Sequence, residues 1–184
     1  LGADGSGTPV GRTGMTWSGF RPSDDACRYG YNIPAQFMAM RALREVGEFT
    51  RVWDDVQLAR RAAQLAEEIE AGVTQYGIVD GHFAYEVDGL GSVLQMDDAN
   101  MPSLLSLPLT SDLRADDPLH LATRAWVLGD ANPYLYRGPA ACGVGSPHSP
   151  AGYVWHIGLA VQGLTGDETE ARSCLETILA TDGG

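Results

Sequence analysis

Apolar residues recur at helical spacing in stretches separated by loops rich in glycine and proline. This period predicts amphipathic helices that bury one face. The first helix is expected to be broken at Pro34 and to end at Gly47. The second is expected to run from Asp54 or Asp55 to Gly72. Their apolar stripes are Phe37, Met40, Leu43 and Val46, then Leu58, Ala62, Leu65 and Ile69.

Four further helices are expected in the second half of the chain. The third follows residues 97–103, where an asparagine and a proline suit a helix start. The fourth begins at Asp117 and ends at Gly129, the fifth covers residues 153–164, and the sixth opens on Asp167 with a capping-box glutamate three residues later. The positions expected to be buried are Leu121, Ala122, Ala125 and Trp126, then Ala171, Cys174, Leu175 and Ile178.

The pattern changes between residues 74 and 90, where short β-prone runs flank Asp80-Gly81. Asp-Gly between such runs is typical of a two-residue hairpin turn. The sequence therefore predicts an all-α chain of six helices with a short β-hairpin insertion. Trp53 and Trp126, at helix positions, are expected to belong to the core.

The loop at residues 13–26 combines several groups of chemical interest. It ends in serine and aspartate residues that suit the start of a helix, because their oxygens accept first-turn N–H groups. The same carboxylates could instead transfer protons in a sugar-binding site. The aromatic rings could stack on an apolar sugar face, and the arginine could bind a sugar hydroxyl or tune the pKa of a carboxylate. The residues concerned are Trp17, Phe20, Arg21, Ser23, Asp24 and Asp25.

Three polar loops, at residues 13–25, 86–101 and 130–152, precede the first, third and fifth predicted helices. If helices alternate in direction, loops before every second helix share one end of the assembly. A break at Pro34 that makes two helices would upset this parity. The side chains expected to converge are Asp24, Asp25, Asp97, Asp98, Asn100, Tyr134 and His148.

Two carboxylate pairs on one face suit three roles. They can hydrolyse a glycoside by acid and base, hold calcium or magnesium, or cap helices. Zinc is disfavoured because the four histidines lack metal-ligand spacing. His148 suits a hydrogen bond to a sugar hydroxyl, or it is an ordinary surface residue.

The net charge of the chain limits the classes of molecule that it can bind. Its net charge is −12, from 24 acidic and 12 basic residues, and every basic residue is arginine. This balance argues against a nucleic-acid partner, and the missing lysine excludes a Schiff base and a Walker-type phosphate loop. No apolar run approaches the roughly 18 residues of a membrane span.

The three cysteines, Cys27, Cys142 and Cys174, are far apart and lack metal-ligand spacing. They are expected to be buried thiols without a catalytic role. Cys27 would lie in the first turn of a helix, which would lower its pKa.

Several blocks of the chain resemble glycoside hydrolase family 125, the exo-α-1,6-mannosidases. They occur in the order of the family and cover nearly the whole chain, so the resemblance is specific. The blocks are Gly14-Met-Thr-Trp-Ser-Gly-Phe-Arg-Pro-Ser-Asp-Asp-Ala-Cys27, Tyr29-Gly-Tyr31, Ile33-Pro34, Tyr85-Glu-Val-Asp-Gly-Leu-Gly91, Met96-Asp-Asp-Ala-Asn100, Pro102-Ser-Leu-Leu-Ser-Leu-Pro108, Asn132-Pro-Tyr134 and Gly143-Val-Gly-Ser-Pro-His148.

The resemblance implies that residues 1–184 are one fragment, about half, of an (α/α)6 barrel catalytic domain. It implies inverting hydrolysis without metal or cofactor, releasing mannose from the non-reducing end of α-1,6-linked glycans. The acid of the family is an aspartate, here Asp25 or Asp24, with a weak preference for Asp25. The other residues implied in substrate binding are Trp17, Arg21, Asp97, Asp98, Asn100 and His148.

The chain also departs from the family pattern. The expected base is a glutamate in a Gly-Phe-Met-His-Glu-Ser-like block, which these 184 residues do not contain. Both ends look truncated. Because the fragment has the acid without the base and lacks the N-terminal half of the barrel, it is expected to be inactive alone. Gln36-Phe37 stands where an Asn-Met pair is expected, interpreted as core variation. The competing hypothesis is a non-catalytic carbohydrate-binding helical domain or a degenerate homologue.

Overall fold

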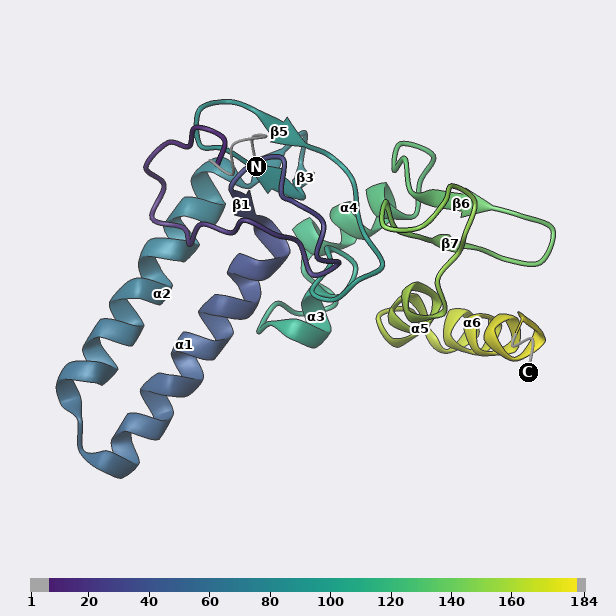
Figure 1. Ribbon diagram of the computed structural model, residues 1–184. Coiled ribbons are helices and arrows are strands. Elements are labelled where there is room, and N and C mark those ends of the chain that lie inside the picture. The colour runs from purple at the N-terminus through teal and green to yellow at the C-terminus, as the bar shows by residue number, and fades with distance from the viewer. Residues whose placement is uncertain (1–6, 182–184) are drawn as a thin grey trace.

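Two long antiparallel helices form one side of the molecule in the computed structural model, which describes residues 7–181 (Figure 1). They are α1 (Ile33–Trp53) and α2 (Val56–Tyr76). Asn32 caps α1 by accepting a hydrogen bond from the N–H of Ala35. The predicted break at Pro34 is wrong, because this proline lies in the first turn, where its missing N–H costs nothing. The predicted start of the second helix is confirmed, since Asp55 caps α2.

Neither glycine predicted to end these helices does so. Gly47 lies inside α1 with open space around it, and the helix ends only at Asp54, in a left-handed conformation. Gly72 lies inside α2, where any Cβ would collide with the carbonyl oxygen of Thr13. The second glycine therefore permits close packing of a loop on the helix instead of terminating it.

The predicted hairpin is confirmed. Strands β2 (Ile78–Val79) and β3 (His82–Phe83) pair antiparallel across Asp80-Gly81, and both turn residues have positive φ, as a type I′ turn requires.

Two further small sheets were not predicted. Their strands have only two or three residues, too few for the alternation that identifies a strand in sequence. In the first sheet β4 lies between β1 and β5, and all pairings are antiparallel. The strands are β1 (Tyr31–Asn32), β4 (Glu86–Val87) and β5 (Val93–Leu94), with a separate pair β6 (Leu135–Arg137) and β7 (Cys142–Val144).

The third predicted helix is reduced to one turn, α3 (Leu107–Thr110), and does not begin near Asn100. Side chains hold the preceding backbone in another form. The carboxylate of Asp97 accepts from two backbone N–H groups, and Ser103 and Ser106 bond to each other's backbone. Such local bonds compete with helix formation.

Helix α4 (Pro118–Val127) begins as predicted, because Asp117 accepts from the N–H groups of Leu119 and His120. Its buried face is different from the predicted one. His120, Thr123 and Val127 are buried. Leu121, Ala122 and Ala125 are exposed, and Trp126 is half-buried.

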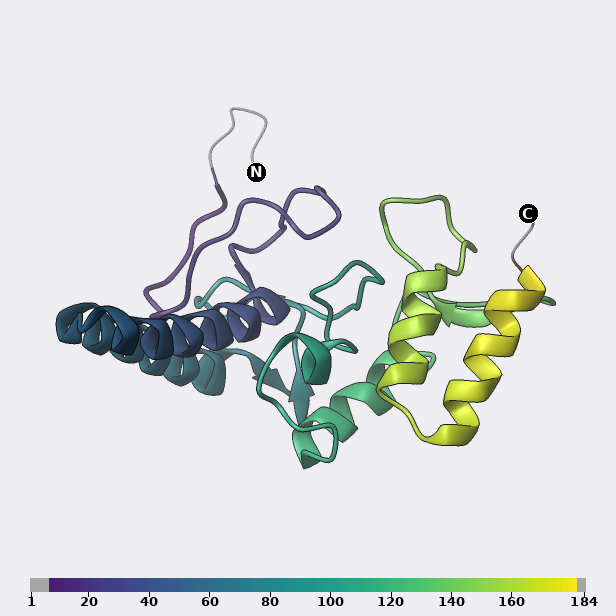
Figure 2. The ribbon, with the colours of Figure 1, turned by 90° about the horizontal axis from the view of Figure 1, so that it is seen from below.

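Helices α5 (His156–Leu164) and α6 (Glu168–Thr181) form a second antiparallel pair on the opposite side of the molecule from α1 and α2 (Figure 2). Asp167 accepts from the N–H of Glu170, as the capping pattern predicts. Of the residues expected to be buried in α6, Cys174 is buried, whereas Leu175 is 56% exposed. The chain is thus mostly helical, with β1 and β2 beside α1 and α2, and the β6–β7 pair beside α5 and α6 (Figure 1).

The core lies under the small sheets and the long loops. Its members include Ile33 of α1, Tyr85 before β4, and Met96 and Leu104 from the following loop. Trp53 was expected there but is 70% exposed at the end of α1. Trp126 stacks on His82 instead, with ring centroids 4.9 Å apart. Within residues 7–181, no helix has both the length and the apolar character needed to cross a bilayer.

Candidate active site

The loop at residues 13–26 does not open a helix. Phe20 and Ala26 form an isolated antiparallel bridge, and the N–H of Asp24 donates to the carbonyl of Arg21 in a tight turn. The interpretation of Asp24 and Asp25 as helix caps is therefore wrong. The chain continues into β1, and the first helix takes Asn32 as its cap.

The two neighbouring aspartates differ in environment. Asp25 Oδ1 lies 3.2 Å from Nδ1 of His148, and Oδ2 accepts from the hydroxyl of Ser23 at 3.1 Å. Asp24 is exposed at the tip of the turn with φ of 65°, in the left-handed region. The turn thus directs Asp25, and not Asp24, toward the histidine loop.

Hydrogen bonds join the three polar loops. The N–H of His148 donates to the hydroxyl of Ser146 at 3.1 Å, and the amide of Asn100 reaches the same hydroxyl at 3.3 Å. The amide of Asn100 also donates to Asp98 at 2.8 Å. The structure therefore brings Asp25, His148 and Asn100 together, as the loop spacing predicts. In Figure 2 the purple, teal and green loops rise on the same side of the molecule.

The second aspartate pair is fully buried. Asp97 accepts from the N–H groups of Leu104 and Leu105 at 2.8 and 3.1 Å, and burial raises its pKa to about 7. This carboxylate organises the loop ahead of α3. Asp98 accepts from Asn100 through Oδ1, while its Oδ2 has no hydrogen-bond partner among the described residues.

Tyr85 is fully buried, and its hydroxyl likewise lacks a partner among residues 7–181. Burial, together with the nearby carboxylates of Asp98 and Asp97, raises its pKa well above the usual value. The phenol therefore keeps its proton. It can donate a hydrogen bond to a group that enters the site.

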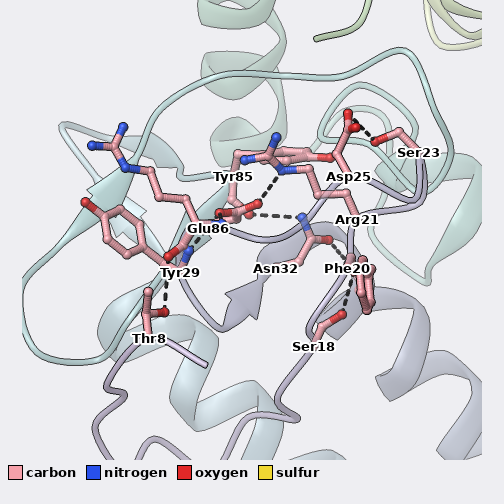
Figure 3. Close-up of polar contacts among 12 residues, drawn as sticks. Thr8, Ser18, Phe20, Arg21, Ser23, Asp25, Tyr29, Asn32, Tyr85 and Glu86 are labelled. Carbon is pink, nitrogen blue, oxygen red and sulfur yellow. Dashed lines mark hydrogen bonds and ion pairs between the residues drawn. The ribbon is translucent and has the colours of Figure 1, made fainter. Parts of the chain in front are cut away.

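Arg21 lies across Tyr85 and forms an ion pair with a residue that was not predicted as a site residue (Figure 3). Its Nε is 2.6 Å from Oε1 of Glu86, whose carboxylate is completely buried. Glu86 lies in the Tyr85–Gly91 block of the sequence, and a charged residue between the apolar Tyr85 and Val87 is the signal that could have identified it.

Trp17 is 52% exposed, with its ring against the backbone of Gly30. Its loop is anchored one residue earlier. Gln36 accepts from the N–H and the hydroxyl of Thr16 and donates to the Thr16 carbonyl. The departure at Gln36 is therefore not neutral core variation. It ties α1 to the loop that carries Trp17 and Asp25.

Cys27 and Cys174 are buried as expected, whereas Cys142 is exposed. Cys27 lies outside any helix, so the predicted lowering of its pKa is wrong. Burial and the neighbouring Glu86 raise the pKa of this thiol to about 11. In the part of the chain that the structure describes, no three His, Cys, Asp or Glu side chains are arranged to hold a metal ion.

Comparison with known proteins gives a consistent picture. The model of a family described as metal-independent alpha-mannosidase (GH125) matches residues 1–184. The meiotically up-regulated gene 157 protein of Schizosaccharomyces pombe is 41% identical over 186 residues, which cover 97% of this chain and 36% of that protein. The chain therefore spans well under half the length of this relative.

A solved structure from Streptococcus pneumoniae is also similar. It matches with a TM-score of 0.95 and 41% identity over 100% of this chain and 45% of that chain. Its description names a new family of widely distributed metal-independent alpha mannosidases, which gives insight into the processing of N-linked glycans. It was solved as a non-productive substrate complex with alpha-1,6-mannobiose.

Proposed function

Because the chain belongs to the metal-independent alpha-mannosidase family GH125, we propose that the protein containing it is an exo-acting, inverting α-1,6-mannosidase. It would release the terminal mannose from the non-reducing end of α-1,6-linked glycans. The α-1,6-mannobiose complex of the streptococcal relative supports this linkage. Residues 1–184 would form about half of an (α/α)6 catalytic barrel, in keeping with their 45% coverage of that relative.

Asp25 is proposed as the general acid that protonates the glycosidic oxygen. The contact between Asp25 and His148 is the observation that carries this assignment, because it sets this carboxylate in the face shared by the three polar loops. Asp24 is exposed in a left-handed backbone conformation, which further favours Asp25 as the acid. In an inverting enzyme the acid needs only to donate one proton to the leaving oxygen per turnover.

The second carboxylate of the reaction is proposed to lie outside these 184 residues. In inverting enzymes it stands about 6.5–9.5 Å from the acid and deprotonates the attacking water. The chain covers 45% of its streptococcal relative, so the remaining part of the fold can supply this base. The isolated chain would then hold an acid without a base.

Asn100 and His148 are proposed to bind hydroxyls of the mannosyl ring beside Asp25, and Trp17 offers an exposed ring for stacking. The buried hydroxyl of Tyr85 and Oδ2 of Asp98 have no hydrogen-bond partner within residues 7–181, so both are free to bind a substrate hydroxyl. Arg21 and Asp97 are proposed to support the site indirectly. Arg21 is paired with Glu86, and the carboxylate of Asp97 accepts hydrogen bonds from backbone N–H groups.

The test uses the full-length protein with α-1,6-, α-1,3- and α-1,2-mannobiose. We expect turnover of the α-1,6 disaccharide alone, with β-mannose as the first product seen by NMR. Initial release of α-mannose would contradict inversion. Binding of the disaccharide without turnover would support the alternative of a non-catalytic carbohydrate-binding protein.

A further inference from the structure

Glu86 is a buried carboxylate at the centre of the three-stranded sheet. It pairs with Asn32 of β1 on one side and with Leu94 of β5 on the other. Its side chain has no exposed surface. A buried charge is costly unless it is paired and hydrogen-bonded, so its partners show what it stabilises.

Among residues 7–181, the hydrogen bonds of the Glu86 carboxylate go to the segment that carries Asp25 (Figure 3). Oε1 accepts from Nε of Arg21 at 2.6 Å. Oε2 accepts from the backbone N–H groups of Arg28 and Tyr29 at 2.8 and 2.9 Å. One carboxylate therefore holds the chain four residues before Asp25 and three residues after it.

The segment between these anchor points is a closed turn. The N–H of Arg21 donates to the carbonyl of Asp25 at 2.8 Å, and the backbone N–H of Cys27 donates to the carbonyl of Gly19 at 2.9 Å. Because the chain is fixed on both sides of the turn, at Arg21 and at residues 28 and 29, Asp25 has little freedom to move relative to the sheet. Catalytic groups lose much of their rate advantage when displaced by about 1 Å.

We propose that Glu86 is a positioning residue for the general acid. It holds the Asp25 turn against the sheet through Arg21 and through the backbone of residues 28 and 29, and it does not contact the substrate. This inference rests on the proposed function, because it assumes that Asp25 protonates the leaving group.

Substrates differ in how much their leaving group depends on the general acid. The α-1,6-linked sugar leaves as an alkoxide unless it is protonated, so its departure depends on a well-placed acid. Dinitrophenolate is stable as an anion and leaves without protonation. A displaced acid should therefore slow hydrolysis of the disaccharide and spare that of an activated aryl mannoside.

The experiment compares Glu86→Gln in the full-length protein with wild type on α-1,6-mannobiose and 2,4-dinitrophenyl α-mannoside. Glutamine cannot accept from both Arg21 and the two backbone N–H groups, since its amide nitrogen is itself a donor. We expect kcat on mannobiose to fall by about 100-fold or more, as for loss of general acid catalysis, and kcat on the aryl mannoside to change by less than about fivefold.

Glu170→Gln is the matched control. Glu170 forms a 2.6 Å ion pair with Arg124, a partly buried pair in another part of the molecule. Its replacement should leave the ratio of the two kcat values at the wild-type level, even if the melting temperature falls.

Equal losses on both substrates, or none on mannobiose, would overturn the role of Glu86. If Glu86→Gln does not fold, Glu86→Asp is tested on the same two substrates. Aspartate keeps the buried charge but is too short to bind both Arg21 and the backbone N–H groups of residues 28 and 29. An unchanged substrate ratio in that variant would also overturn the proposal. Wild-type protein that hydrolyses neither substrate would instead refute the proposed function itself.

Discussion

Asp24 and Asp25 are chemically identical neighbours with different surroundings. One is exposed in a left-handed turn position, and the other contacts His148 and Ser23. The sequence could narrow the acid to this pair but could not separate its members. The deciding contact comes from a residue 123 positions away, which no local pattern reports.

Asp25→Asn in the full-length protein should lower kcat on α-1,6-mannobiose by about 10²–10⁴-fold, the usual contribution of a general acid. Asp24→Asn should retain activity close to that of wild type, because its side chain faces solvent. Steady-state kinetics of both variants measure this. Undiminished activity of the Asp24→Asn, Asp25→Asn double variant would refute the assignment.

Gln36 shows another limit at the residue scale. Its place beside Phe37, at the start of a predicted helix, did not indicate the three hydrogen bonds that it makes to Thr16. Likewise Glu86 was visible as a polar residue within a recognisable block, but its partners come from more than 50 residues earlier in the chain. Patterns identify elements and blocks, whereas side-chain partners depend on tertiary packing.

His120 gives a residue-scale prediction about pH. It is fully buried, both ring nitrogens lack partners among the described residues, and burial together with Arg124 lowers its pKa. The unfolded chain therefore binds a proton near pH 6.5, where the folded protein does not. The neutral His120 therefore contributes favourably to the free energy of unfolding above about pH 6.5. This contribution is lost as the pH falls toward the lowered pKa of the folded state.

The test compares wild type with His120→Leu by thermal unfolding at pH 5.0 and pH 7.5. The variant should gain stability relative to wild type at the lower pH. The raised pKa of Asp97 acts in the opposite direction, and it is the same in both proteins, so it cancels in the comparison. A difference independent of pH would contradict a neutral, buried His120.

At the scale of elements, capping residues predicted the starts of α2, α4 and α6 correctly, whereas Gly47 and Gly72 do not end α1 and α2 as expected. Asp55, Asp117 and Asp167 cap the helices that they were expected to open. A cap is a local interaction between a side chain and the next turn, so the sequence contains it. Whether a glycine ends a helix or admits a neighbour depends on what packs there, as Gly72 and the Thr13 backbone show.

Gly47 and Gly72 form a matched pair for a stability experiment. Gly47→Ala should raise the free energy of unfolding by about 1 kcal/mol, because alanine is the better helix former and nothing lies within 4 Å of the new Cβ. Gly72→Ala should lower it by about 1–3 kcal/mol through overpacking against Thr13. Denaturant unfolding of the full-length variants measures both, and shifts of equal sign would contradict the packing explanation.

At the scale of the whole molecule, the 184 residues expose many large apolar side chains. Phe49 is 61% exposed, Val52 is 81% exposed, and Leu164 and Leu179 are exposed by 72% and 67%. These residues lie on both helical pairs. Exposed apolar surface of this kind is typical of an interface. The half-barrel proposal accounts for it, because neighbouring helix pairs would cover these faces.

The isolated 184-residue chain should therefore be poorly stable, bind a hydrophobic dye more strongly than the full-length protein, and show no turnover of α-1,6-mannobiose. Dye fluorescence and product analysis at equal concentrations of the two proteins check this. Turnover by the short chain would show that its own residues supply the base.

The contact between Asp25 and His148 also has a consequence for biosynthesis. Asp25 emerges from the ribosome 123 residues before its histidine, so the nascent chain carries a carboxylate whose partner has not yet been made. Orientation of this side chain must wait for the later segment to emerge and fold back. Translation products that terminate before residue 148 would hold every group of the acid turn and still lack the neighbour that orients it.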